Sequence, residues 1–222
     1  MYRAVIFDVD GTLVDSNDAH AQAWVDALSE RGRRVSFERV RPLIGMGGDK
    51  LLPKVAGIPA DSSEGEAISD RRREIFQHTY LPQLQPTRGA NALLEHLRDD
   101  RLALVVASSA QAAEIEGLLQ VAGATKLFES RASSDDAARS KPDPDIVQAA
   151  IDRTGCPRDD VIMVGDTPYD IAAAQRAGIG IVALRCGGWP DTALTSALAI
   201  YDDPADLLER YDLSPFKRAR PM

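Results

Sequence analysis

Short apolar runs recur along the chain and are separated by longer segments of mixed polarity. They lie at residues 3–7, 102–107, 161–164 and 180–184, with a weaker run near residues 127–132. Continuous apolar runs of this length are typical of strands that are buried on both faces, as in parallel sheets. From residue 88 onward the segments between the runs carry apolar residues at helical spacing, as in residues 89–98 and 110–122. This alternation predicts an α/β fold with a doubly wound, Rossmann-like parallel sheet.

The first two apolar runs are separated by about 95 residues, far more than an ordinary crossover between strands needs. Residues 16–83 hold helical patterns and no strand pattern. These patterns cover Asp18 to Arg31, which ends at Gly32, a piece from Phe37 to Leu43, and Glu64 to Tyr80. We therefore expect two domains: an α/β core of residues 1–15 and 84–222, and a helical cap of residues 16–83 inserted after the first strand.

Two carboxylates, Asp8 and Asp10, follow the first apolar run directly and precede Gly11. Side chains at i and i+2 of an extended segment point the same way, and chemistry in open α/β sheets gathers outside the carboxyl ends of the strands. Two unit charges about 4 Å apart repel by roughly 4 kcal/mol at an effective dielectric of 20, so one carboxyl must protonate or a cation must intervene. Mg²⁺ suits this position because it binds one or two protein carboxylates together with a substrate phosphate. The alternative is that both acids are ordinary turn and cap residues.

A second pair of acids, Asp166 and Asp170, follows the apolar run at residues 161–164. Pro168 suits the first turn of a helix, and acids four residues apart can share one side of such a strand-to-helix junction. A second acidic strand end, on a sheet that already carries one, favours metal ligation by Asp166. The alternative is that Asp166 only caps the helix.

Lys141 lies just before a helical pattern that runs from residue 145 to residue 154. Asp143 is expected to be the N-cap of this helix, Pro144 its first residue and Gly155 its C-terminal stop. An ammonium fixed on this loop would supply positive charge to a pocket that holds several carboxylates and a phosphate. A lone lysine is more often a solvated surface residue.

Ser108 and Ser109 end the apolar run at residues 102–107. A hydroxyl can donate to a phosphate oxygen without adding charge, so both serines are candidates for phosphate binding. Capping of the helix expected from Ala110 explains them nearly as well.

Together these four segments resemble the haloacid dehalogenase-like (HAD) superfamily of phosphohydrolases, in its capped phosphatase and phosphomutase branch. The resemblance spans essentially the whole chain, and its first motif is the most specific. The matching positions, in the order of the four motifs, are Asp8-Val-Asp10-Gly11-Thr12, Ser108, Lys141 and Gly165 to Asp170.

The resemblance implies a role for each matching residue. Asp8 would attack phosphorus, and Asp10 would protonate the leaving alcohol and then activate water. Mg²⁺ would be held by Asp8, by Asp10 through its backbone carbonyl and by Asp166, with Asp170 supporting this shell. Ser108 and Lys141 would grip the phosphoryl oxygens.

Asp10 narrows the reaction that the resemblance implies. Dehalogenases and phosphonate hydrolases of the superfamily lack this second acid, so phosphate-ester chemistry is favoured. We expect a phosphomonoester hydrolase that acts through an aspartyl-phosphate on a small phosphorylated metabolite, for example a sugar phosphate. The alternatives are a sugar-phosphate mutase similar to β-phosphoglucomutase, and a noncatalytic phosphate-binding or metal-binding module on the same fold.

Substrate-selecting residues are expected in the cap, and the candidates are His20, Arg41, Gly47 and Lys50. The placement of His20 relative to Asp8 and Asp10 resembles that in β-phosphoglucomutase. His20 would donate to the substrate, position Asp10, or be a structural histidine. The cap lysine of that enzyme has no clear counterpart here, and residues 71–73, all arginine, are the nearby basic candidates. Residues 45–50 are either a flexible loop that faces the pocket or a loop that ends a helix.

Composition is that of a small enzyme. The chain has 222 residues, of which 44% are hydrophobic and 27% charged, which excludes disordered and membrane-embedded classes. No signal-peptide pattern is present, so we expect the cytoplasm, no membrane partner, and a monomer or weak homodimer. The net charge of −8 would repel polyanions and disfavours nucleic acid as a partner. Cys156 and Cys186 lack the spacing of a metal site.

Overall fold

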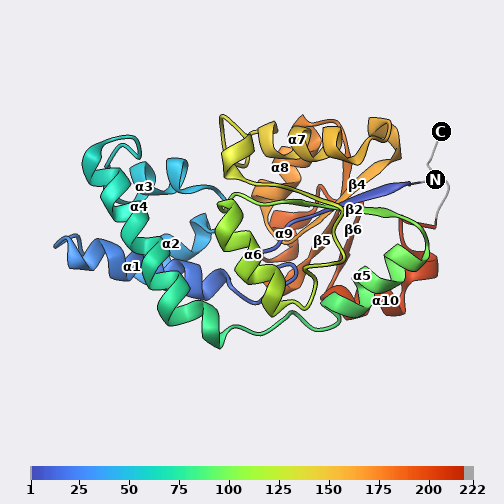
Figure 1. Ribbon diagram of the computed structural model, residues 1–222, viewed down its shortest axis with the longest axis horizontal. Helices are drawn as coiled ribbons and strands as arrows, with labels where there is room; N and C mark the ends of the chain where they lie inside the picture. The colour runs from blue at the N-terminus through green and yellow to red at the C-terminus, as the bar shows by residue number, and fades with distance from the viewer. Residues whose placement is uncertain (1, 218–222) are drawn as a thin grey trace.

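The computed structural model describes residues 2–217, and its centre is one sheet of six parallel strands (Figure 1). The strands are β1 (Ala4–Phe7), β2 (Ala103–Ala107), β3 (Ser130–Ala132), β4 (Val161–Gly165), β5 (Gly180–Leu184) and β6 (Ala199–Tyr201). Their order, β3-β2-β1-β4-β5-β6, is that of a doubly wound Rossmann-like sheet and confirms the predicted fold class. Met1 and residues 218–222, which the predicted core includes, lie outside the described residues.

Helices cover both faces of the sheet, because successive residues of a strand point to opposite sides. One face packs against α5 (Ala90–Asp99), α6 (Ala112–Val121) and α10 (Pro204–Glu209), and the other against α7 (Asp145–Thr154), α8 (Pro168–Arg176) and α9 (Asp191–Leu194). In β1, Val5 and Phe7 belong to the first core, and Ala4 and Ile6 to the second. All four are fully buried, which explains why the strand is a continuous apolar run.

The register of the central strands brings their carboxyl ends together. Phe7 of β1 pairs with Val106 of β2 and with Val164 of β4. Asp8 directly follows Phe7, and Ser108 and Asp166 lie two residues beyond Val106 and Val164, so all three emerge at one edge of the sheet. The point where the strand order reverses lies at this same edge, beside β1.

Residues 17–80 form a group of helices beyond that edge, at the left of Figure 1. They are α1 (Asn17–Glu30), α2 (Phe37–Val40), α3 (Gly48–Ala56), α4 (Ser63–Ile75) and a π-helical turn at Phe76–Tyr80, with no strand among them. Helix α3 was not predicted, because it is short and carries Pro53 inside it. The division into a core and a cap at residues 15/16 and 83/84 stays a prediction, and this separate group of helices supports it.

The prediction for Asp143 is wrong. Helix α7 begins at Asp145 with Pro144 in the cap position, whereas Asp143 forms ion pairs with Lys50 at 2.7 Å and Arg176 at 3.4 Å. Two basic side chains therefore use the carboxylate that would otherwise cap the helix. Within residues 2–217, no helix combines the length and apolar character needed to cross a bilayer.

Candidate active site

A cavity of about 390 Å³ lies between the helices of residues 17–80 and the carboxyl edge of the sheet. Its volume is within the range of small-molecule sites. Asp8, Asp10 and Ser108 line it from the sheet edge, and Trp24 and Met46 line it from the helical segment. The cavity is therefore lined both by the predicted catalytic residues of the sheet edge and by the helical segment in which substrate-selecting residues are expected.

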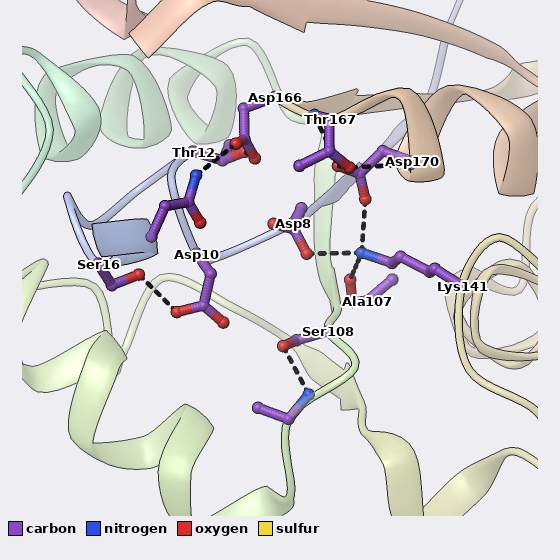
Figure 2. Close-up of polar contacts among 12 residues, drawn as sticks. Asp8, Asp10, Thr12, Ser16, Ala107, Ser108, Lys141, Asp166, Thr167 and Asp170 are labelled. Carbon is purple, nitrogen blue, oxygen red and sulfur yellow. Dashed lines mark hydrogen bonds and ion pairs between the residues drawn. The ribbon is translucent and has the colours of Figure 1, made fainter. Parts of the chain in front are cut away.

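Beside the cavity, Asp8, Asp166 and Asp170 each bring one carboxylate oxygen within 4.8 Å of the others, and all three are buried. Figure 2 shows that Lys141 reaches into this group. Its Nζ lies 2.5 Å from Asp8 Oδ1, 2.7 Å from Asp170 Oδ1 and 2.7 Å from the carbonyl oxygen of Ala107. The contacts with Asp8 and Ala107 are hydrogen bonds and the contact with Asp170 is an ion pair, and together they fix Nζ in one place.

Asp166 is fixed by side chains of the segment that follows β1 and by close packing. Its two oxygens accept from Thr12 Oγ1 and Asn17 Nδ2, each at 2.9 Å. A Cβ on Gly187 would lie only 1.8 Å from Asp166 Oδ2, and one on Gly11 would lie 2.3 Å from it. Any side chain at these two glycines would therefore displace Asp166 from the cluster.

Asp170 is fixed by the start of helix α8. Thr167 is the N-cap and Pro168 the first helical residue, as predicted for the proline. Asp170 Oδ2 accepts from the backbone N–H of Thr167 at 3.0 Å and from its hydroxyl at 2.6 Å, while Thr167 Oγ1 accepts from the Asp170 N–H at 3.1 Å. This capping box leaves Oδ1 to face Lys141.

The cluster holds more negative charge than one ammonium neutralises. Burial, and after it repulsion from Asp170, raises the pKa of Asp166 to about 8. Burial also raises the pKa of Asp8 well above its ordinary value, although Lys141 opposes the effect. Burial alone would favour the neutral amine of Lys141, but Asp170 and Asp8 outweigh it and raise the lysine pKa. A bound divalent cation would neutralise the negative charge of the three carboxylates that Lys141 leaves uncompensated.

The donor set fits such a cation. Carboxylate oxygens are hard ligands of the type that Mg²⁺ and similar ions prefer, and Asp8, Asp166 and Asp170 offer three at mutually close positions. Beside Asp166, the buried Oδ1 of Asn17 has no hydrogen-bond partner among the described residues. These residues together are suited to a divalent metal site.

Asp10 also lines the cavity but is held by a separate set of bonds (Figure 2). Its Oδ1 accepts from Ser16 Oγ at 2.6 Å and lies 2.5 Å from His20 Nε2. Both contacts use Oδ1, and no hydrogen bond from the described residues reaches Oδ2. Burial opposes ionisation of Asp10, but His20, Ser16 and Arg72 outweigh burial and hold the pKa of Asp10 below its ordinary value.

The contacts of His20 define which ring nitrogen carries its proton. The ring is buried and stacks on Phe76, with centroids 3.9 Å apart. Arg72 Nη2 lies 2.5 Å from His20 Nδ1, and because arginine only donates, Nδ1 must accept and Nε2–H must donate to Asp10. Arg72 is held in turn by Glu114 of α6, which is 2% exposed, at 2.8 Å. A chain of polar contacts therefore links α6 and α4 to Asp10.

The two serines differ in their contacts, although both line the cavity. Ser108 Oγ accepts the backbone N–H of Ala110 at 3.1 Å and keeps its own proton for another acceptor. The helix that was expected from Ala110 begins at Ala112 with Gln111 as its N-cap, so neither serine caps it. The buried Oγ of Ser109 has no partner among the described residues. Both hydroxyls can therefore donate to a ligand.

Of the other cap candidates, Gly47 lines the cavity, whereas Arg41 and Lys50 do not. Arg41 binds Asp18 at 2.5 Å and the carbonyl oxygen of Gly187 at 2.7 Å. Lys50 binds Asp143 and the backbone carbonyl of Ser140. These contacts tie the helical segment to core loops, and they give no support to a substrate role for Arg41 or Lys50.

Four residues of the site were not singled out by the sequence as site residues: Thr12, Ser16, Asn17 and Glu114. The first three lie within ten residues of Asp8, so a polar stretch after the first strand was the available signal. Arg72 was visible only as one of three consecutive arginines. Glu114 gives no signal, because its burial depends on how α4 lies against α6.

Acids gathered after the first and fourth strands of a doubly wound sheet, beside a covered cavity, indicate an enzyme that handles anionic substrates with the help of a metal. The chain belongs to the haloacid dehalogenase-like hydrolase family, whose sequence profile matches residues 5–184. The resemblance found in the sequence is thereby confirmed.

Several relatives of the chain are named phosphatases. The phosphoglycolate phosphatase of Rhodospirillum rubrum is 32% identical over 219 residues, which cover 93% of this chain and 90% of that protein. The validoxylamine A 7'-phosphate phosphatase of Streptomyces hygroscopicus subsp. limoneus is 29% identical over 195 residues, or 83% of this chain and 86% of that protein. A crystal structure of a hydrolase from Pseudomonas syringae has a TM-score of 0.88 at 30% identity and covers 95% of this chain and 98% of that one. Within its family the chain is thus a hydrolase of the phosphatase class.

Proposed function

We propose that the protein is a Mg²⁺-dependent phosphomonoester hydrolase that works through an aspartyl-phosphate on Asp8. The proposal depends above all on two differently held carboxylates at one cavity. Asp8 lies in a buried charged cluster, whereas Asp10 is held by His20 and Ser16. Placing two acids in contrasting environments is how an active site separates a nucleophile from a general acid and base.

In the first step the Asp8 carboxylate attacks phosphorus, and the bond between phosphorus and the ester oxygen breaks. Lys141, 2.5 Å from Asp8 Oδ1, orients this carboxylate. Asp10 gives its proton to the leaving oxygen, so the alcohol departs uncharged. A phosphate dianion close to Asp10 raises the pKa of this carboxyl in the complex, because like charges disfavour the ionised form.

In the second step water attacks phosphorus and the bond between phosphorus and the Asp8 oxygen breaks. Inorganic phosphate is released, and the Asp8 carboxylate is regenerated. Asp10, now ionised, takes the proton of the water through Oδ2. The bonds from His20 and Ser16 to Oδ1 favour this ionised form. Ser108 and Ser109 offer hydroxyl donors to the phosphoryl oxygens.

Asp8, Asp166 and Asp170, with the backbone carbonyl of Asp10, would hold the Mg²⁺. When bound, the ion supplies positive charge to the phosphoryl oxygens and so stabilises the charge of the transition state. The helical segment of residues 16–83 would act as the cap over this site and limit the access of water. The named relatives act on phosphorylated small molecules, which supports a small phosphorylated metabolite as the substrate.

Inorganic phosphate release tests this function. We expect the purified protein with Mg²⁺ to hydrolyse p-nitrophenyl phosphate and members of a panel of sugar and acid phosphates. Chelation of the metal with EDTA should lower the rate at least about 100-fold, because a bound metal stabilises the charge of the transition state by several kcal/mol. Added Mg²⁺ should restore the rate. Conversion of a sugar phosphate into its isomer without phosphate release would contradict the proposal and favour a mutase.

Arg72 is expected to be a positioning residue for Asp10. Arg72→Met removes the donor that holds His20 Nδ1 as an acceptor, so the ring can change its tautomer and lose the bond to Asp10. We expect kcat to fall about 10- to 100-fold, within the range of general acid–base contributions, with a smaller change in KM and a shifted pH profile. Arg72→Lys, which also only donates, should recover part of the rate.

Nuclear magnetic resonance of the histidine ring nitrogens provides an independent measurement for Arg72. The wild-type spectrum should show His20 protonated at Nε2, and the Arg72→Met spectrum should not. An unchanged tautomer together with an unchanged pH profile would show that Arg72 has only a structural role.

A further inference from the structure

Helices α3, α4 and α6 form a charged wall of the cavity. Its charged residues are Asp49, Glu66, Asp70, Arg72, Arg73 and Glu114. Four are acids and two are bases, so this wall carries a formal charge of −2. A ligand whose phosphate lies at Asp8 would place its remaining atoms in the space that this wall bounds.

The first base of the wall, Arg72, is engaged through both of its Nη atoms, whereas its buried Nε has no hydrogen-bond partner among the described residues. Its Nη1 lies 2.8 Å from Glu114 Oε2 and 3.2 Å from Oε1, and its Nη2 binds His20. The guanidinium lies over the rings of Trp24 and Phe76, at 5.6 and 5.4 Å from their centroids. Withdrawing Arg72 toward a ligand would leave the buried Glu114 without its counter-charge, which is unfavourable.

The second base, Arg73, is engaged as well. It forms an ion pair with Asp70 and a hydrogen bond with the side-chain oxygen of Gln111. Each arginine of the wall is therefore matched to one acid of the wall.

Two acids of the wall have no basic partner among the described residues. Asp49 accepts the hydroxyl of Ser140, a neutral donor, and Glu66 forms no ion pair within residues 2–217. Lys50, the neighbour of Asp49 in the sequence, is bound to Asp143. The space beside the reacting phosphate thus presents unneutralised negative charge.

We infer that the protein selects phosphate monoesters whose alcohol carries a cationic amine, and that it discriminates against alcohols with a carboxylate or a second phosphate. This inference rests on the proposed function, because it assigns the leaving-group side of the same site. An ammonium would be attracted by Glu66 and Asp49, and an uncharged hydroxylated alcohol would be tolerated. A second anion would be repelled by both acids and would find its possible partners, Arg72 and Arg73, already paired.

A matched series of two-carbon esters tests the inference. Phosphoethanolamine, 2-hydroxyethyl phosphate and phosphoglycolate differ mainly in a group that is cationic, neutral or anionic. We expect kcat/KM to fall in that order, with phosphoethanolamine about tenfold above phosphoglycolate, which corresponds to about 1.4 kcal/mol. Equal values, or a preference for phosphoglycolate, would overturn the inference.

A charge reversal at Glu66 locates the effect. Glu66→Lys should reduce the preference for phosphoethanolamine over phosphoglycolate at least about fivefold, because it turns a repulsive contact for the anion into an attractive one. Glu95→Lys, on the exposed side of α5 outside the cavity, makes the same change in net charge and should leave the preference unaltered. An equal effect of both variants would overturn the assignment to the cavity wall.

p-Nitrophenyl phosphate separates this inference from the proposed function. Hydrolysis of this ester with the wrong order in the two-carbon series would defeat the inference and leave the hydrolase standing. Failure to release phosphate from any of the four esters in the presence of Mg²⁺ would count against the proposed function itself.

Discussion

Replacement of Asp8 by asparagine should lower kcat for phosphate release by at least about 10⁴-fold, the scale of losses when a nucleophile is removed. The amide of the variant cannot form the aspartyl-phosphate, and Asp10, which is held separately by His20 and Ser16, cannot take over this step. Steady-state phosphate release measures the effect. Acid quenching with a radiolabelled ester should trap labelled wild-type protein and no labelled variant.

The loss in the Asp8→Asn variant should not come from unfolding. In the metal-free protein burial and the neighbouring acids already disfavour ionised Asp8, and Lys141 keeps its contacts with Asp170 and Ala107. We therefore expect a Tm equal to that of the wild type or higher. Asp99→Asn, at the exposed end of α5, is the matched control and should keep full activity. Substantial turnover by Asp8→Asn would show that another group is the nucleophile.

The positions of Asp8, Asp166 and Ser108 could be predicted because each follows an apolar run that is long enough to be a buried strand. Parallel strands in register bring their carboxyl ends to one edge, so the strand pattern alone assembles these residues. The position of Pro168 in the first turn of α8 is equally local. These features depend on neighbours in the sequence and on sheet geometry, both of which a single chain reveals.

The contacts of Arg72 and Glu114 could not be predicted in the same way. They join α4 to α6, and this pairing depends on how the helices of residues 17–80 lie against the core. The same limit applies to β6, a strand of three residues. Its strand form comes from pairing with β5 at the sheet edge, because strand propensity in so short a segment is weak compared with its surroundings.

The position of Lys141 depends both on its neighbours in the sequence and on contacts with distant parts of the chain. Its place before a helix is local, but its burial is not, since its partners Asp8 and Ala107 lie 133 and 34 residues away in the chain. A lysine that is 1% exposed is rare unless it is paired. Its position therefore shows that the acidic cluster requires a fixed positive charge even before a metal binds.

Replacement of Lys141 by methionine should lower the free energy of unfolding of the metal-free protein by about 3–5 kcal/mol, the cost of breaking a buried ion pair. The variant leaves Asp8 and Asp170 without their common counter-charge and the carbonyl oxygen of Ala107 without its donor. Urea unfolding in EDTA measures the change. Lys126→Met, at an exposed position, is the control and should stay within about 0.5 kcal/mol of the wild type.

Mg²⁺ should reverse part of this loss, and this is the sharper test. The acids that Lys141 no longer neutralises are those that fit the cation, so a ligand that binds only the folded state should stabilise the variant. We expect Mg²⁺ to raise the Tm of Lys141→Met by more than it raises the Tm of the wild type, and Lys141→Arg to be intermediate in EDTA because it keeps the charge. A variant as stable as the wild type in EDTA, or one on which Mg²⁺ has no effect, would show that Lys141 and the metal do not neutralise the same carboxylates.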